Sequence, residues 1–199
     1  MTRAKSWPRS ELVPWLLIVV GVFAFRSSLA DHYYVPSGSM ENTLLAGDRV
    51  LVSKLTYGLR LPFTAVELLR GQQVARGDVV IFDSPRDGTR LIKRIIGVGG
   101  DIVSLHDGHL MVNDVAAGGD PAGSERIGRH VALLNLADGG GPDIDRLEIP
   151  EGMLLAVGDH RGNSLDGRYF GLVREGDVYG KALAVYYRRD GEGFTWKSL

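Results

Sequence analysis

The fold is decided by the stretch GDVVIF at residues 77–82. Glycine supplies turn geometry, and the β-branched residues that follow the aspartate favour extended chain. The same Gly-Asp pair precedes apolar, strand-like residues in three other stretches, at 47–52, 100–105 and 176–187. We therefore expect a series of strands that begin at Gly-Asp turns.

Glycine and turn residues support a mainly β fold. The chain has 27 glycines among 199 residues, about twice the average usage. Asp107-Gly108 lies between two short strand-like runs and predicts a two-residue hairpin turn. Residues 104–149 are rich in glycine and predict a small loop-rich insertion with little core of its own. A short helix is expected over residues 64–70, and the remaining domain is expected to be an antiparallel β-sheet.

The composition excludes several classes of protein. A net charge of −1 gives no reason to expect a nucleic-acid partner. The absence of cysteine excludes disulfides, a thiolate nucleophile and a cysteine zinc site. The His-Glu-x-x-His pattern of zinc peptidases does not occur.

The N-terminus predicts a membrane anchor. Residues 12–25 are fourteen uncharged, mostly apolar residues, and Arg3, Lys5 and Arg9 precede them. A span needs about 20 residues, a length that a helix continuing to Ala30 reaches. Positive charge before the span predicts a cytoplasmic N-terminus. We therefore divide the chain into a cytoplasmic N-terminus and transmembrane anchor at 1–30 and an exported domain at 31–199. A signal peptide cleaved after Ala30 is the alternative.

The stretch PSGSM at residues 36–40 contains a candidate nucleophile. Gly38 allows a sharp turn that exposes the side chain and N–H of Ser39. The Ser37 hydroxyl and the Ser39 N–H could then face one developing oxyanion. A Ser-Gly-Ser turn is also common in ordinary loops.

Lys93 is a candidate general base. It lies in LIKRIIG at residues 91–97, and strand alternation places it on one face with Leu91 and Ile95. An apolar environment disfavours the ammonium form, which lowers a lysine pKa from its free value of about 10.4. The alternative is a lysine whose stem packs while its amine reaches water.

The stretch GDHRGNSLDGRYFG at residues 158–171 is dense in polar side chains. Ser164 could hydrogen-bond to Lys93 and fix its rotamer, and Asp166 could pair with Arg168 to hold the loop. The alternative is a polar surface turn. A Ser39–His160 pair is a rival catalytic set that we disfavour, because most loop histidines are solvated.

Together these stretches resemble the type I signal peptidases, the Ser-Lys proteases that remove signal peptides from exported proteins. Four motifs match in the family's order, at residues 36–44, 77–82, 92–101 and 158–171. The resemblance implies a serine endopeptidase without a cofactor. It also implies roles for six residues: Ser39 as nucleophile, Lys93 as general base, Ser37 as oxyanion donor, Ser164 as the residue that orients Lys93, and Asp166 and Arg168 as supports of the site.

The chain departs from the family's pattern at Glu41-Asn42, His160, Gly162 and Gly167. None of these positions removes a catalytic group. They leave open whether the chain is the general signal peptidase or a specialised one that serves a secretion or conjugation system.

The resemblance implies a single-pass protein of the bacterial inner membrane with its catalytic domain on the exported side. Its substrates are preproteins with small residues at the −1 and −3 positions, and Ile81 and Phe82 are expected to line part of their pocket. Membrane lipid is an expected partner, the secretion translocon is a candidate partner, and nucleic acid is not expected. Two rival classes are a catalytically silent, membrane-tethered β-domain and a self-cleaving Ser-Lys repressor. The anchor and the missing DNA-binding helix pair argue against the repressor.

Overall fold

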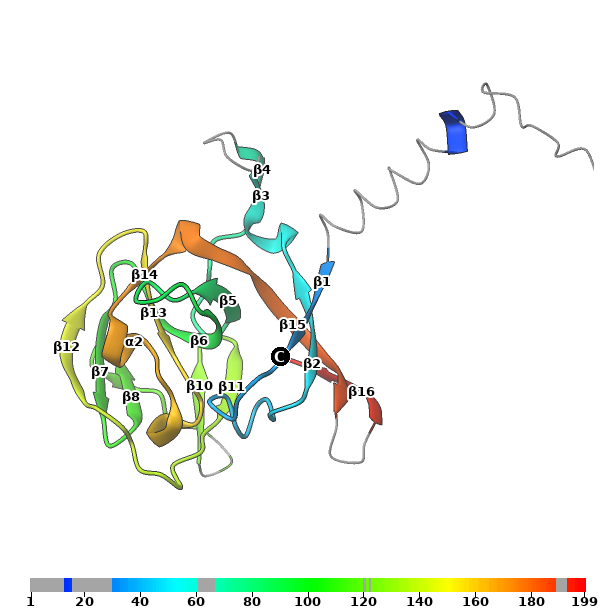
Figure 1. The fold of residues 1–199 in the computed structure, drawn as a ribbon. Coiled ribbons are helices and arrows are strands. Elements are labelled where there is room, and N and C mark those ends of the chain that lie inside the picture. Colours follow the sequence, from blue (N-terminus) through cyan, green and yellow to red (C-terminus); the bar gives the residue numbers. More distant parts are fainter. Residues whose placement is uncertain (1–12, 16–29, 61–66, 120, 122, 189–192) are drawn as a thin grey trace, which may run out of the picture.

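Strands make up most of the regular structure (Figure 1). This computed structural model describes residues 13–15, 30–60, 67–119, 121, 123–188 and 193–199. Neighbouring strands pair antiparallel in every ladder of these residues, as predicted. Among the described residues, no helix is long and apolar enough to cross a membrane. Most of the predicted anchor lies outside these residues.

An eight-stranded sheet forms the centre of the protein. Its order is β1 (Ala30–Tyr34), β2 (Arg49–Ser53), β15 (Val178–Arg188), β5 (Val79–Asp83), β6 (Arg90–Val98), β13 (Met153–Val157) and β14 (Val173–Arg174), and β16 (Gly193–Ser198) pairs with β15. The eleven-residue strand β15 joins the two halves. Lys181 on β15 is in register with Ser53 on β2 and with Val80 on β5.

Residues 104–149 contain more regular structure than the sequence indicated. A four-stranded sheet has the order β12 (Ile144–Glu148), β7 (Ile102–His106), β8 (His109–Val112) and β9 (Val115–Ala116), and β10 (Ser124–Ile127) pairs with β11 (His130–Leu133). Leu105, Leu110 and Ile127 are buried here and pack with Ile96 and Leu155 of the main sheet. The loop-rich interpretation with little core was therefore wrong, because strands of two to five residues resemble loops in sequence.

The Gly-Asp turns begin strands as predicted, since β2, β5, β7 and β15 each start at the residue after the aspartate. In three of these turns the aspartate side chain accepts a hydrogen bond from the N–H three residues earlier, at 3.0–3.1 Å. These aspartates are Asp48, Asp78 and Asp101. Each is buried and forms an ion pair with a distant cation: Asp48 with Arg188, Asp78 with Lys181, and Asp101 with Arg76. The turns thus fix both the start of a strand and its position in the fold.

Two smaller predictions have different outcomes. The turn at Asp107-Gly108 joins β7 to β8 as a hairpin in which His106 faces His109, which confirms the prediction. The helix predicted over residues 64–70 is wrong for its described part, since Glu67–Arg70 forms β4, which pairs with β3 (Gly58–Arg60). The local apolar spacing resembled a helix, but pairing with β3 determines the conformation.

The short helices lie in connections. They are η1 (Leu55–Tyr57), η2 (Arg161–Asn163), α2 (Gly167–Phe170) and η3 (Glu175–Asp177).

Strand β5 is buried on both faces: Ile81 packs in the core with Val50 of β2, and Phe82 packs in the core with Leu154 of β13. Both side chains have 0% exposure, so neither lines an open pocket and that prediction was wrong.

Candidate active site

Ser39 lies in the long connection between β1 and β2. The base of this connection is closed by backbone hydrogen bonds from Val35 N–H to the Asp48 carbonyl and from Gly47 N–H to the Val35 carbonyl, both 2.9 Å. Met40 and Leu44 are fully buried in the core beneath the connection. These contacts hold the turn against the sheet while leaving Ser39 near the surface, with 8% exposure.

Gly38 begins a tight turn that brings Glu41 back towards it. The Glu41 side chain folds back over it, so a Cβ at position 38 would lie 2.6 Å from Glu41 Oε1. The Glu41 N–H also donates to the Gly38 carbonyl at 3.0 Å. The sharp turn predicted at Gly38 is therefore present.

Lys93 meets Ser39 in this structure. Its Nζ lies 2.5 Å from Ser39 Oγ, and the lysine is 3% exposed. Lys93 is on β6 in register with Val80 of β5, so the sheet fixes the position of its backbone. The alternative in which the amine reaches water is therefore wrong.

The environment of Lys93 favours its neutral form. Its pKa is lowered from 10.5 to about 8, mainly by burial, and the positive charge of Arg168 acts in the same direction. Asp166 and Asp159 act in the opposite direction, because their negative charges favour the ammonium. Burial is the largest contribution, and with a pKa of about 8 roughly a tenth of the amine is neutral at pH 7 and able to accept a proton.

Ser37 lies beside the same hydroxyl. Its Oγ is 3.4 Å from Ser39 Oγ, at the long limit of a hydrogen bond. In the described part of the chain, the Ser39 N–H donates to no backbone acceptor. Both donors are therefore available to an oxygen that develops charge next to Ser39.

Ser164 does not make the hydrogen bond that the sequence suggested. Its Oγ is buried and has no hydrogen-bond partner among the described residues. Gly158 lies between Ser164 and the nucleophile turn. A Cβ at position 158 would overlap both Ser164 Oγ and the Ser39 carbonyl oxygen, so only glycine fits there. The hydroxyl is therefore close to the Ser39 backbone but is not bonded to Lys93.

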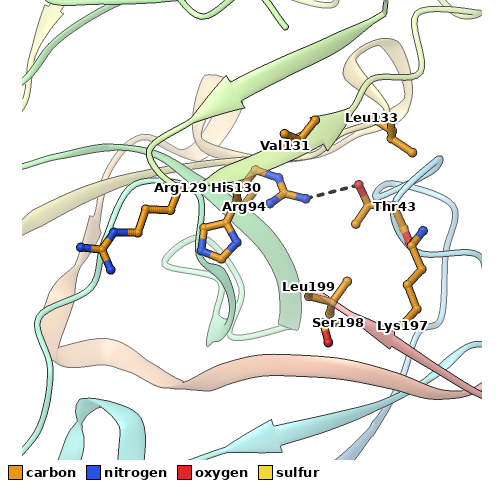
Figure 2. Close-up of a pocket in the computed structure, with 9 residues that line it drawn as sticks. All are labelled: Thr43, Arg94, Arg129, His130, Val131, Leu133, Lys197, Ser198 and Leu199. Carbon is orange, nitrogen blue, oxygen red and sulfur yellow. Dashed lines mark hydrogen bonds between the residues drawn. The ribbon is translucent and has the colours of Figure 1, made fainter. Parts of the chain in front are cut away.

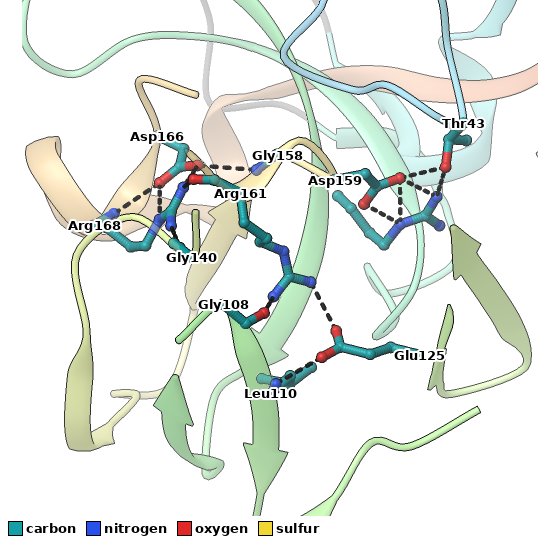
Figure 3. Close-up of polar contacts among 11 residues, drawn as sticks. Thr43, Gly108, Leu110, Glu125, Gly140, Gly158, Asp159, Arg161, Asp166 and Arg168 are labelled. Atoms are coloured by element: carbon teal, nitrogen blue, oxygen red, sulfur yellow. Dashed lines mark hydrogen bonds and ion pairs between the residues drawn. The ribbon is translucent and has the colours of Figure 1, made fainter. Parts of the chain in front are cut away.

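Asp166 and Arg168 form a buried pair, as suggested (Figure 3). Arg168 Nη2 lies 2.8 Å from Asp166 Oδ2, and both side chains are 0% exposed. Asp166 also accepts from the Gly158 N–H at 3.0 Å, and Arg168 donates to the carbonyls of Gly140 and Arg161. The pair thus joins the loop after β13 to the connection before β12.

Comparison with known proteins decides the family. The family model described as signal peptidase, peptidase S26, matches residues 9–187. The chain belongs to this signal peptidase family. The family predicted from the four motifs is therefore confirmed, and so is the prediction that the chain is a peptidase.

Individual signal peptidases are similar over most of this chain. Signal peptidase I of Pseudomonas fluorescens is 32% identical, with 83% of this chain and 67% of the relative covered. Signal peptidase I of Buchnera aphidicola is 27% identical, with 98% and 80% covered. A solved signal peptidase I structure from Enterococcus faecalis is 31% identical and covers 55% of this chain and 97% of its own, with a TM-score of 0.40.

The sequence interpretation missed a buried polar network in this signal peptidase, between Arg94 and Asp159. Figure 3 labels two of its members, Asp159 and Thr43. Arg94 Nη2 lies 2.8 Å from Asp159 Oδ2, and the side chains are 2% and 1% exposed. Thr43 donates to Asp159 at 2.5 Å, and Arg94 Nη1 donates to the Gly77 carbonyl at 2.8 Å. Through Thr43, Gly77, Arg94 and Asp159 the network contains one residue of each of the four matching motifs, and Arg94 is the residue next to Lys93 in the sequence. An arginine within an apolar strand was the feature of the sequence that could have indicated a buried ion pair.

A pocket of about 260 Å³ lies next to this network, and Thr43 and Arg94 line part of it (Figure 2). Thr43, Arg94, His130, Lys197 and Leu199 contribute to its lining, and none of the six predicted site residues does. Arg94 donates to Thr43 Oγ1 at its edge, at 3.3 Å. The residues that the structure describes contain no group of histidine or acidic side chains placed to hold a metal ion.

Proposed function

We propose that this signal peptidase cleaves its substrates with Ser39 as nucleophile and Lys93 as general base. The observation that carries the proposal is the 2.5 Å distance between Lys93 Nζ and Ser39 Oγ, with the lysine 3% exposed. A buried amine with a lowered pKa is what a serine hydroxyl needs for activation in the absence of histidine.

The reaction proceeds through an acyl-enzyme. Neutral Lys93 takes the Ser39 proton as Oγ attacks the scissile carbonyl carbon, and the Ser39 N–H and Ser37 hydroxyl stabilise the oxyanion. The Lys93 ammonium then donates its proton to the leaving amine as the peptide bond breaks. Lys93, neutral again, next removes a proton from a water molecule as the water attacks the ester carbonyl carbon. It then donates this proton to Ser39 Oγ as the ester bond breaks and the carboxylic acid product leaves.

Asp166, Arg168 and Ser164 have supporting roles in the proposal. Asp166 raises and Arg168 lowers the pKa of Lys93, so the buried pair adjusts the lysine without contacting the substrate. Ser164 Oγ, which has no partner among the described groups, is free to bond to the amine during the reaction.

The substrate we propose is a preprotein with small residues at −1 and −3, whose signal segment lies in the same bilayer. Residues 1–30 anchor the chain with the N-terminus in the cytoplasm, and residues 31–199 act on the exported side of the inner membrane. Lipid is in contact with this domain, and the secretion translocon delivers the substrate. The proposal for the anchor rests on Arg3, Lys5 and Arg9 before the apolar residues 12–25.

The test uses the full chain in detergent with a purified preprotein, and mass spectrometry locates the cut. Wild type should cut once after the signal segment, and Ser39→Ala should cleave at background level while keeping its melting temperature. Cleavage by Ser39→Ala at more than about a tenth of the wild-type rate would reject Ser39 as nucleophile.

A further inference from the structure

His160 lies between two carboxylates beside the nucleophile turn. Its Nε2 is 2.9 Å from Asp138 Oδ2, and its Nδ1 is 3.4 Å from Glu41 Oε2. Nδ1 is also 3.3 Å from the Gly38 carbonyl oxygen. The imidazole is only 6% exposed, whereas the two acids are 33% and 58% exposed. Asn135 Nδ2, 3.5 Å from Nδ1, is at the limit of hydrogen-bond distance.

Polar groups of separate segments surround this imidazole. Asp138 Oδ2 lies beside Nε2, at an ion-pair distance but without the geometry of a hydrogen bond. The Gly38 carbonyl, the Glu41 carboxylate and the Asn135 amide lie beside Nδ1. The side chain is therefore in contact with the nucleophile turn on one side and with Asp138 on the other.

The contacts join three segments that are far apart in the sequence. Gly38 and Glu41 belong to the nucleophile turn, His160 follows β13, and Asp138 precedes β12. The His160 N–H also donates to the Ser39 carbonyl at 3.2 Å. The backbone and the side chain of His160 therefore both hold the residues around Ser39.

We propose that His160, bridging Glu41 and Asp138, is a positioning residue that fixes the turn at residues 38–41 so that Ser39 Oγ faces Lys93. The inference rests on the proposed function of Ser39 and Lys93 and deepens it. His160 touches neither reacting atom, so it acts on them through the carbonyls of Gly38 and Ser39 and through Glu41. Loss of the bridge loosens the turn and lengthens the distance between Ser39 Oγ and Lys93 Nζ.

The experiment measures kcat and KM of the full chain in detergent with one preprotein, together with the melting temperature. The variants are His160→Ala, Glu41→Gln and Asp138→Asn. His106→Asn is the matched control, since His106 lies 3.8 Å from Asp143 in an exposed pair. His160→Ala should lower kcat by up to about 100-fold with little change in KM, because misplacing a reacting group affects the chemical step.

The carboxamide variants keep the shape of the acids and should give smaller losses of kcat. Glu41→Gln should have little further effect in the His160→Ala background, because residues that share one interaction are not additive. His106→Asn should match wild type.

Two results would overturn the positioning role. They are a wild-type kcat in His160→Ala, whether or not its melting temperature falls, and full additivity with Glu41→Gln. If His160→Ala fails to fold, a wild-type kcat in both Glu41→Gln and Asp138→Asn would overturn it. An active Ser39→Ala would reject the proposed function itself, whereas an inactive Ser39→Ala with unaffected His160 variants would reject only the positioning role.

Discussion

Lys93 Nζ and Ser39 Oγ lie 2.5 Å apart although 54 positions separate the two residues in the sequence. Ser39 comes from the connection between β1 and β2, and Lys93 comes from β6 on the opposite side of β15. This is the one polar contact of the Lys93 side chain among the described residues. The state of the amine is therefore set mainly by burial, and the following expectations depend on that.

The rate of cleavage should depend on the neutral form of Lys93. Since its pKa is about 8, kcat/KM should rise as pH passes through about 8 and the ammonium loses its proton. Lys93→Arg should be almost as inactive as Lys93→Ala, because a guanidinium keeps its proton in this range. The measurement is kcat/KM for one preprotein between about pH 6 and about pH 10. A rival Ser39–His160 mechanism instead predicts an active Lys93→Arg enzyme, and that result would refute the lysine base.

Removal of Lys93 should stabilise the fold at neutral pH. The folded pKa is lowered from 10.5 to about 8, so the unfolded chain binds more protons between these values and wild-type stability rises with pH across that window. Lys93→Met should therefore be more stable than wild type below about pH 8, by up to about 3 kcal/mol less the lost hydrogen bond. The advantage should shrink towards pH 10.5. Urea unfolding at both ends of the window tests this, and a variant less stable than wild type at neutral pH would contradict it.

Replacement of Ser164 should separate stability from activity. Its buried Oγ has no partner among the described groups, and an unsatisfied buried hydroxyl costs about 1–3 kcal/mol. Ser164→Ala should therefore keep or raise the melting temperature while lowering kcat without eliminating it. Thermal unfolding and single-turnover cleavage check the two parts. Unchanged kcat would remove Ser164 from the mechanism.

Asp159→Asn should destabilise the fold and shift the pH profile. It leaves the buried guanidinium of Arg94 without its carboxylate, at a cost of about 3–5 kcal/mol. Asp159 raises the pKa of Lys93, so its loss should move the rise in kcat/KM to lower pH. Asp83→Asn is the control, because Asp83 pairs with Arg90 at an exposed site where an ion pair contributes little. A profile that moves to higher pH would contradict the assigned effect of Asp159.

Local turn chemistry made much of the fold predictable. The Gly-Asp pairs and the turn at Asp107-Gly108 determine their own conformation, and strands begin where these residues end. The insertion was not predictable in the same way. Its short strands have little periodicity, and burial of residues such as Leu105 and Ile127 depends on contacts with the distant residue Leu155.

In the candidate active site, too, the features set by local sequence were predictable and those set by distant contacts were not. Ser39 and Lys93 each lie in a short motif, so their residue types could be recognised without knowledge of the fold. The pairing of Arg94 with Asp159 was missed because the partner lies 65 positions later and an arginine in an apolar strand can also reach solvent. The hydrogen bond suggested for Ser164 depended on a side-chain orientation that sequence does not determine.

The place of β15 in the main sheet has a consequence for biosynthesis. In the sheet that the described residues form, strand β2, next to the Ser39 turn, and strand β5, next to the Lys93 strand, each pair with β15 (Val178–Arg188), which lies between them. A ribosome makes both residues of the pair long before it makes the strand that aligns them. In the nascent polypeptide, therefore, the sheet can align this serine and this lysine only after residues 178–188 have been made and β15 has paired with the earlier strands.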